Sequence, residues 1–205
     1  MKTNGIILAA GLSSRMKAFK PLLKLKGKTI IENTIDSMFY AGVDQVSLVL
    51  GYRGREVEAK LHGKYDRKRL LYIYNNEYAH TDMLTSVKIG IKSLNTCDAF
   101  YLLPGDMPAV NTKTFLNVKQ VMEGSNAMVI FPTIDGYRKH PPLISWKCID
   151  YILKFEGEGG LREVWKKLAS KSETVPVEDV GCTLDADTPE DFNRLTEYMD
   201  DNATF

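Results

Sequence analysis

Short apolar runs alternate with amphipathic segments through most of this 205-residue chain. The apolar runs predict buried strands at residues 6–10, 46–50, 70–74, 99–103 and 127–131. Between them, apolar residues recur at helical spacing and predict helices at residues 29–42, 56–61, 83–94 and 112–122. Strands that alternate with helices form βαβ units around a mostly parallel sheet. The order of the elements therefore predicts the α/β class.

The last third of the chain follows a looser pattern. Beyond Phe131 come irregular stretches at 140–142 and 157–160, then a strand predicted at 182–184 and a final helix. Thr188 suits the cap of that helix, Pro189 suits its first turn, and the acidic residues that follow complement the helix dipole. Neither repeats nor low-complexity linkers interrupt the chain, so we predict a single domain over residues 1–205.

The charge balance excludes a partner that is recognised through a strong overall field. Lysine and arginine number 27, aspartate and glutamate 26, and the formal net charge is +1. Binding to nucleic acid or to a membrane surface is therefore not expected. Three isolated cysteines, an odd number, indicate a reducing compartment. The N-terminal apolar run is too short for the core of a signal peptide, and we expect a cytoplasmic protein.

The end of the first predicted strand is the segment most informative about chemistry. It reads Leu-Ala-Ala-Gly-Leu-Ser-Ser-Arg-Met over residues 8–16. Ligands bind at this carboxyl edge of open α/β sheets, and small residues let a base or a phosphate approach the main chain. Arg15 and Lys20 add positive charge for a triphosphate. The nucleotide-binding residues expected here are Leu8, Ala9, Ala10, Gly11, Ser13 and Ser14.

A plain strand and turn with scattered surface cations would leave a similar pattern, and composition alone favours neither interpretation. Three other sequence patterns are absent. No G-x-G-x-x-G follows the first strand and no G-x-S-x-G occurs. The segment Gly27-Lys28-Thr29 resembles the tail of a P-loop, but Leu22 stands where the leading glycine would be. A dinucleotide fingerprint, a nucleophile elbow and a P-loop are therefore excluded.

Two acidic residues at the predicted ligand edge suit a divalent cation. Asp106 follows the strand at 99–103, and Asp187 lies just before the final helix. Carboxylates that share one crevice can hold Mg²⁺ against triphosphate oxygens. Asp185 and Asp187 alternate along an extended segment, so we expect only one to face the crevice and assign Asp187. A turn aspartate bonded to its own backbone is the other interpretation of Asp106.

Five sequence segments stand in order along nearly the whole chain: 8–16 with Lys20, 105–108, 136–141, 157–162 and 185–191. Together they resemble the MobA-like nucleotidyltransferase family, and within it the molybdenum cofactor cytidylyltransferases. The resemblance implies a single-domain, Rossmann-like, three-layer α/β/α nucleotidyltransferase fold of the GT-A-like kind. It also implies Mg²⁺ as the cofactor, held by Asp106 and Asp187.

The resemblance further implies where the two substrates contact the chain. The residues implied to act in catalysis are Arg15, Lys20 and Asp106. Besides the first loop, the base and ribose would meet Asn75, Thr85 and Ser86. The residues implied to bind the acceptor phosphate are Arg138, His140, Gly159, Gly160 and Arg162. Lys139 and Pro142 depart from the family pattern near that acceptor site.

The reaction that we expect is in-line attack by an acceptor phosphate on the α-phosphorus of a nucleoside triphosphate, with release of pyrophosphate. Such transfers depend on positioning and on charge neutralisation more than on a protein nucleophile. Ala10 favours CTP, since relatives that use GTP look like L-A-G-G at this turn and relatives that use CTP look like L-A-A-G. The implied acceptor is the molybdenum cofactor (molybdopterin), and a client molybdoenzyme is a further implied partner.

Other functions stay open at the level of sequence. The same chemistry could serve a sugar phosphate, phosphocholine or another alcohol phosphate, or could use GTP to make the guanine dinucleotide form of the cofactor. A different class is a non-catalytic chaperone that binds the mature cofactor and hands it to a partner enzyme. Release of pyrophosphate distinguishes an enzyme from a chaperone.

Overall fold

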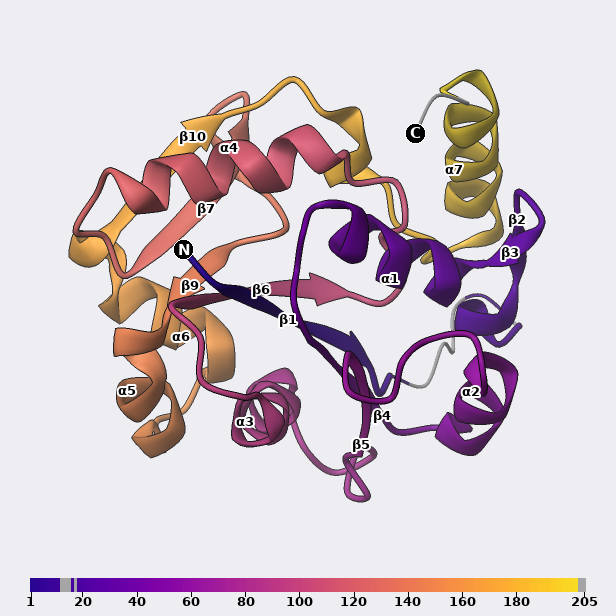
Figure 1. The fold of residues 1–205 in the computed structure, drawn as a ribbon, viewed down its shortest axis with the longest axis horizontal. Coiled ribbons are helices and arrows are strands. Elements are labelled where there is room, and N and C mark those ends of the chain that lie inside the picture. The colour runs from indigo at the N-terminus through magenta and orange to yellow at the C-terminus, as the bar shows by residue number, and fades with distance from the viewer. Residues whose placement is uncertain (12–15, 17, 203–205) are drawn as a thin grey trace.

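The computed structural model describes residues 1–11, 16 and 18–202. An eight-stranded sheet crosses the molecule in the order β10-β7-β9-β6-β1-β4-β5, with β8 paired to β7 (Figure 1). Its strands are β1 (Thr3–Ala9), β4 (Val46–Leu50), β5 (Leu70–Tyr74), β6 (Ala99–Pro104), β7 (Val129–Ile134), β8 (Tyr137–Arg138), β9 (Leu143–Ser145) and β10 (Ser172–Pro176). A separate antiparallel ribbon joins β2 (Lys24–Leu25) and β3 (Lys28–Thr29).

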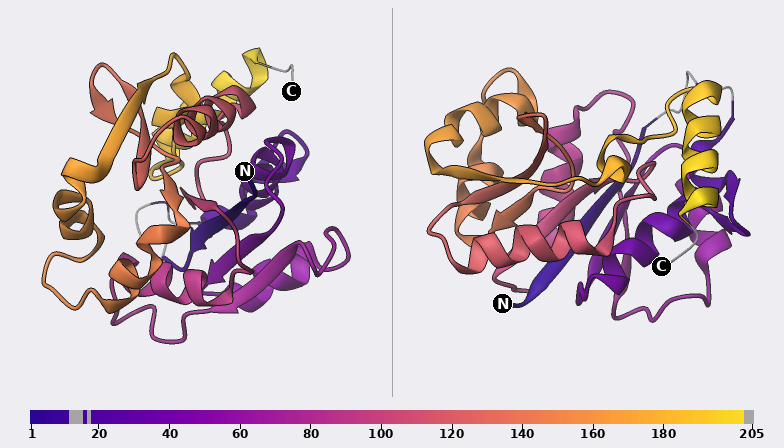
Figure 2. Two further views of the ribbon diagram at one scale, coloured as in Figure 1. Left: turned by 60° about the vertical axis from the view of Figure 1, so that its left-hand side comes forward. Right: turned by 90° about the horizontal axis from the view of Figure 1, so that it is seen from above.

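Seven α-helices connect or flank the strands of the described chain. They are α1 (Ile30–Tyr40), α2 (Gly54–Leu61), α3 (Met83–Ser93), α4 (Thr112–Glu123), α5 (Ile149–Lys154), α6 (Gly160–Lys167) and α7 (Pro189–Asp201). Helices α1, α2 and α4 cover one face of the sheet, and α3, α5 and α6 cover the other (Figure 2). The predicted α/β class and the mostly parallel sheet are thus confirmed. None of the described helices is long and apolar enough to span a membrane.

Strand β1 lies at the centre of both cores. Successive side chains of a strand point to opposite faces, and accordingly Ile7 packs with α1 while Ile6 packs with α3. Each helix packs closely against the strand at a glycine, which is Gly5 of β1 for α1 and Gly90 of the helix itself for α3. A Cβ atom on Gly5 would lie 2.5 Å from Met38 Sδ, and one on Gly90 would lie 2.8 Å from Ile6 Cγ2. Larger residues at these two places would force the layers apart.

The connections of β1 and β6 leave the sheet in opposite directions. Strand β1 pairs in parallel with β4 on one side and with β6 on the other. The chain after β1 continues toward β4, whereas the chain after β6 continues through α4 toward β7. Such a reversal opens a crevice between the carboxyl ends of the two strands. The fold therefore creates a ligand site beside Ala9 and Pro104.

The structure differs from the sequence-based prediction mainly in the last third. The strand predicted at 182–184 is wrong, because Val180–Thr183 forms a 3₁₀ turn, η5. Its first residue follows Asp179, whose carboxylate accepts the Gly181 amide at 3.0 Å. A Cβ on Gly181 would lie 2.0 Å from the Ala109 carbonyl oxygen, so this turn packs directly against the Ala109 backbone and needs glycine there.

Two strands in this region carry no strong sequence signal. Strand β9 is three residues long and runs antiparallel between β6 and β7. Strand β10 forms one edge of the sheet, and it is polar and largely exposed. Strand β9 is too short, and β10 too polar, to show the apolar run that identifies a buried strand.

The final helix begins as predicted, at a Thr188 cap. The side chain of Asp191 does more than face the helix dipole, because it accepts hydrogen bonds from Thr188 N at 3.1 Å and Thr188 Oγ1 at 2.7 Å. The pair forms a capping box. Helix α7 then packs through Leu195 and Met199 against Leu25 of the ribbon. This contact forms a small third apolar cluster.

Helix α1 begins with a second capping box, and this one is buried. Glu32 accepts hydrogen bonds from Thr29 N at 2.7 Å and Thr29 Oγ1 at 2.6 Å, and it also pairs with Lys64. Burial by itself would raise the pKa of Glu32, but the hydrogen bonds from Lys64 and Thr29 outweigh it and lower the pKa to about 2. The ionised carboxylate therefore stabilises the folded protein.

We predict that Glu32→Gln lowers the free energy of unfolding at neutral pH by about 2–3 kcal/mol. The folded pKa lies below the ordinary value of 4.5, so the stabilisation is complete above that pH and is lost as the pH falls toward 2. The difference between variant and wild type should shrink over the same range, as measured by urea unfolding. Glu56→Gln, which alters an exposed pair with Arg53, is the control and should change stability little. A difference that is independent of pH would contradict this account.

Candidate active site

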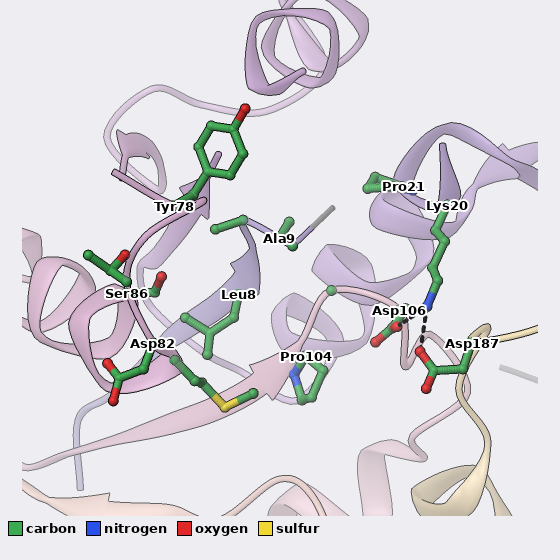
Figure 3. Close-up of a pocket in the computed structure, with 15 residues that line it drawn as sticks. Leu8, Ala9, Lys20, Pro21, Tyr78, Asp82, Ser86, Pro104, Asp106 and Asp187 are labelled. Atoms are coloured by element: carbon green, nitrogen blue, oxygen red, sulfur yellow. Dashed lines mark hydrogen bonds and ion pairs between the residues drawn. The ribbon is translucent and has the colours of Figure 1, made fainter. Parts of the chain in front are cut away.

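A cavity of about 430 Å³ opens at the carboxyl edge of the sheet, between the ends of β1 and β6 (Figure 3). Strand ends, the first loop, the start of α3 and the segment before α7 all contribute to its wall. The lining residues are Leu8, Ala9, Ala10, Gly11, Lys20, Pro21, Tyr78, Thr81, Asp82, Met83, Ser86, Pro104, Gly105, Asp106 and Asp187. Ala9, Ala10 and Gly11 give this part of the wall only small side chains or none.

The turn after β6 carries Asp106 into the cavity. Gly105 N donates to Leu8 O at 2.8 Å, which ties the turn to the end of β1. A Cβ on Gly105 would lie 3.1 Å from both Ala9 Cβ and Leu8 O, so only glycine fits this close approach without displacing a neighbour. The sequence Pro104-Gly105 thus ends the strand and directs the next carboxylate toward the crevice.

Lys20 joins this carboxylate to a second one from the far end of the chain. It opens the 3₁₀ turn η2 (Lys20–Leu22) and is only 7% exposed. Its Nζ lies 2.5 Å from Asp187 Oδ1 and 3.3 Å from Asp106 Oδ2 (Figure 3). Residues from the first loop, the centre and the C-terminal segment therefore converge on one charged cluster.

Asp185 lies close to this cluster but does not line the cavity. Its Oδ1 accepts a hydrogen bond from Asp187 N at 3.3 Å, which braces the extended segment before α7. Burial raises the pKa of Asp185, and the negative charges of Asp106 and Asp187 raise it further. Three carboxylates thus share one region, and two of them face the cavity.

The donor set suits a cation that takes most of its ligands from a substrate. No cluster of three or more His, Cys, Asp or Glu side chains able to hold a metal occurs in the described chain. Mg²⁺ characteristically binds through one or two carboxylates plus substrate phosphates and water. Asp106 and Asp187, which contact the same ammonium nitrogen, fit that requirement.

The nucleotide-binding residues expected from sequence separate into three groups. Leu8, Ala9, Ala10, Gly11 and Ser86 line the cavity. Asn75 and Thr85 do not line it. Asn75 Nδ2 instead donates to Ser86 Oγ at 3.1 Å. Thr85 Oγ1 donates to Asp82 Oδ1 at 3.0 Å, in the cap of α3. Ser13, Ser14 and the catalytic candidate Arg15 lie outside the described residues.

The residues expected at the acceptor do not line the cavity, but Gly160 lies at its rim. A Cβ on Gly160 would lie 2.5 Å from Asp82 Oδ2, so the start of α6 directly borders the cavity rim. Gly159, with a φ of +89°, precedes that helix and leaves its first amides without a side-chain cap. Arg162 is exposed on α6.

Arg138 and His140 approach from the β7–β8 hairpin side. The Arg138 guanidinium lies 4.5 Å from the centroid of the Phe131 ring, and that ring packs edge-on against Trp165 of α6. His140 Nδ1 is 3.4 Å from Leu102 O. Burial lowers the pKa of His140, while the Leu102 carbonyl and the charge of Asp106 act in the opposite direction. Burial of the imidazole therefore favours its neutral form.

An aromatic cluster forms a part of the wall that sequence reasoning missed. Tyr78 lines the cavity, its ring centroid lies 6.3 Å from that of Tyr52, and Tyr52 lies 5.9 Å from Phe19. Gly51 makes this packing possible, since a Cβ there would lie 2.6 Å from Ala10 O and 2.7 Å from Tyr78 Cβ. The three rings come from separate loops, and no spacing along the chain indicates that they meet.

Comparison with known proteins agrees with this geometry. Residues 5–173 match the family described as MobA-like NTP transferase domain. The chain is 33% identical over 193 residues to molybdenum cofactor cytidylyltransferase of Escherichia coli K12, and the alignment covers 94% of each protein.

Solved structures share the fold at lower identity. A nucleotidyl transferase from Methanothermobacter has a TM-score of 0.79 at 22% identity, with 96% of this chain and 97% of that chain covered. Rv0371c of Mycobacterium tuberculosis, solved as a complex with manganese, has a TM-score of 0.73 at 22% identity, with 96% and 98% covered. The family match spans most of the chain, and the similarity to the Escherichia coli enzyme spans nearly all of it. The chain therefore belongs to the family of MobA-like NTP transferases.

Proposed function

We propose that this protein transfers CMP from CTP to the phosphate of a molybdopterin-type molybdenum cofactor and releases pyrophosphate. The observation that carries the proposal is the cluster of Lys20, Asp106 and Asp187 beside the small-residue end of β1, within one cavity. The identity of 33% with a cytidylyltransferase of this specificity, over 94% of both proteins, supports the choice of substrates. The dinucleotide product would pass to a client molybdoenzyme in the cytoplasm.

In the proposed reaction an oxygen of the acceptor phosphate attacks the α-phosphorus of CTP. A new P–O bond forms as the bond to the bridging oxygen of the β-phosphate breaks, and that oxygen leaves with the electron pair in pyrophosphate. Lys20 would neutralise charge on the triphosphate and on the leaving group. Mg²⁺ held by Asp106 and Asp187 would supply Lewis-acid polarisation of phosphate oxygens when bound. No protein nucleophile is required.

The small-residue wall at Ala9, Ala10 and Gly11 would let the base and the α-phosphate approach the main chain. The methyl group of Ala10 narrows the space above the backbone, which favours a pyrimidine over a larger purine. Ser86 lies in the cavity wall with its hydroxyl fixed by Asn75, and it can offer a hydrogen bond to the cytosine edge. A wrong base would leave such buried polar groups unpaired, which lowers its rate of transfer.

The start of α6 is the proposed contact for the acceptor phosphate. Its uncapped amides border the cavity at Asp82, and Arg162 adds positive charge on the same helix. Backbone N–H groups at a helix N-terminus favour an anion. The acceptor would then reach the α-phosphorus from the side opposite the leaving pyrophosphate.

The substrates are tested by incubating the protein and Mg²⁺ with each of the four nucleoside triphosphates, with and without molybdenum cofactor. We expect pyrophosphate release that requires both CTP and the cofactor, with GTP and ATP slower by about 10²-fold. Equal use of GTP would contradict the base assignment. Turnover with only a sugar phosphate or phosphocholine would contradict the acceptor, and cofactor binding without any release would indicate a chaperone.

The two proposed metal ligands are tested by Asp106→Asn and Asp187→Asn. Each should lower kcat by about 10²–10³-fold, the range seen when one group that stabilises transition-state charge is removed. Circular dichroism should show an intact fold. Asp185→Asn is the matched control, because an asparagine oxygen can still accept the Asp187 amide. An equal loss in Asp185→Asn would show that the metal ligand is wrongly assigned.

Lys20→Ala should lower kcat by about 10²-fold while the KM for the acceptor changes little, because the proposed partner of the ammonium is the triphosphate. Lys24→Ala removes an exposed lysine four residues further along and should leave both constants near those of the wild type. Steady-state kinetics with CTP and acceptor varied separately give the two constants. Wild-type turnover in Lys20→Ala would reduce this lysine to a structural role.

A further inference from the structure

A buried hydroxyl on α1 contacts the turn that carries Asp106. Thr34 is fully buried, with 0% of its surface exposed. Its Oγ1 lies 3.0 Å from Ile30 O in the same helix and 3.1 Å from Gly105 O, which is 71 residues further along the chain. The sequence pattern alone places Thr34 in the apolar face of this helix.

The Gly105 carbonyl needs this proton more than the Ile30 carbonyl does. A threonine hydroxyl has a single proton to donate. Within the helix, Ile30 O is the acceptor for the backbone amide four residues later. Gly105 is buried, and the described part of the chain provides no other donor to its carbonyl oxygen. Without the hydroxyl, that oxygen would be buried and unsatisfied, which is costly enough to move a turn.

The opposite side of the same peptide is also tied down. Gly105 N donates to Leu8 O at 2.8 Å. A Cβ on Gly105 would lie 3.1 Å from Ala9 Cβ and 3.2 Å from Ile31 Cδ1. The turn therefore packs closely against both β1 and α1. The next residue, Asp106, depends on this turn for its direction into the cavity. Its Oδ2 lies 3.3 Å from Lys20 Nζ there.

We propose that Thr34 is a positioning residue. Its hydroxyl holds the Gly105 carbonyl and thereby orients the Asp106 carboxylate toward the proposed metal ion. Thr34 touches neither substrate nor reacting atoms. Its effect on catalysis rests on the proposed function, in which Asp106 holds a metal with CTP. Groups that orient a metal ligand typically change metal affinity or activity by about 10–100-fold when they are removed.

The test compares Thr34→Val, which removes the hydroxyl at nearly constant shape, with Thr34→Ser, which keeps the hydroxyl. Ser37→Ala is the control, because Ser37 is also buried on α1 and its Oγ donates only locally, to Thr34 O at 2.9 Å. Two quantities are measured: hydrogen exchange of the Gly105 amide, and the Mn²⁺ affinity of the protein with CTP, followed by electron paramagnetic resonance.

We expect exchange at Gly105 to be at least about tenfold faster in Thr34→Val than in the wild type. Mn²⁺ affinity with CTP should fall by about 10–100-fold. Thr34→Ser and Ser37→Ala should leave both quantities near the wild-type values, even where thermal stability drops. Unchanged exchange in Thr34→Val would overturn the proposed anchor, and faster exchange with unchanged Mn²⁺ affinity would overturn its link to Asp106.

Failure of the proposed function would look different. A wild-type protein that binds no Mn²⁺ with CTP would contradict that function, while the exchange measurement would still decide whether Thr34 anchors the turn.

Discussion

Strand β1 hydrogen-bonds in parallel to β4 along one edge and to β6 along the other, and the rest of the molecule depends on this double pairing. The strand is buried on both faces, with α1 on one side and α3 on the other. Because the connections after β1 and β6 diverge, the two carboxyl ends cannot be covered by their own helices. The cavity beside Ala9 and Pro104 follows from this topology.

Charge within the cavity is balanced across distant parts of the chain. The ammonium of Lys20 is almost buried and contacts Asp106 and Asp187, while Asp185 lies close enough for their charges to raise its pKa. Two carboxylates face the cavity against a single lysine, and the excess of negative charge favours a cation there. In the proposed reaction the triphosphate brings negative charge, and Lys20 would exchange a carboxylate partner for a phosphate.

The two proposed substrate sides meet at the start of two helices. The cap of α3 uses Asp82, and α6 begins against that carboxylate at Gly160, where a φ of +56° favours glycine. The start of α3, proposed to contact the nucleotide, and the start of α6, proposed to contact the acceptor, are therefore direct neighbours. A rigid junction of this kind suits an in-line transfer, in which the positions of the two reactants decide the rate.

Local sequence determined the elements with strong periodicity and clear caps. The strands at 46–50 and 70–74 occupy the predicted residues, and Thr29 and Thr188 begin helices as capping boxes. The ligand edge of the sheet was also predictable, because Ala9, Ala10 and Gly11 stand directly after a buried strand. The charge of Lys20, Asp106 and Asp187 indicated a phosphate and metal site, and the order of five segments indicated the family.

Tertiary structure decided what depends on contacts between distant residues. The strand expected at 182–184 is a 3₁₀ turn, which the Asp179 side chain caps by accepting the Gly181 amide. Tyr78 becomes part of the cavity wall where separate loops meet. The hydroxyl of Thr34 donates to the carbonyl of Gly105, 71 residues further along the chain. The periodicity of apolar residues in the sequence shows which face of an element is apolar. A hydrogen bond between two elements depends instead on how those elements pack. The sequence by itself determined which side chains stand at the edge of the sheet. Only the packing of α1 against β1 and β6 determined how the turn that carries Asp106 is oriented there.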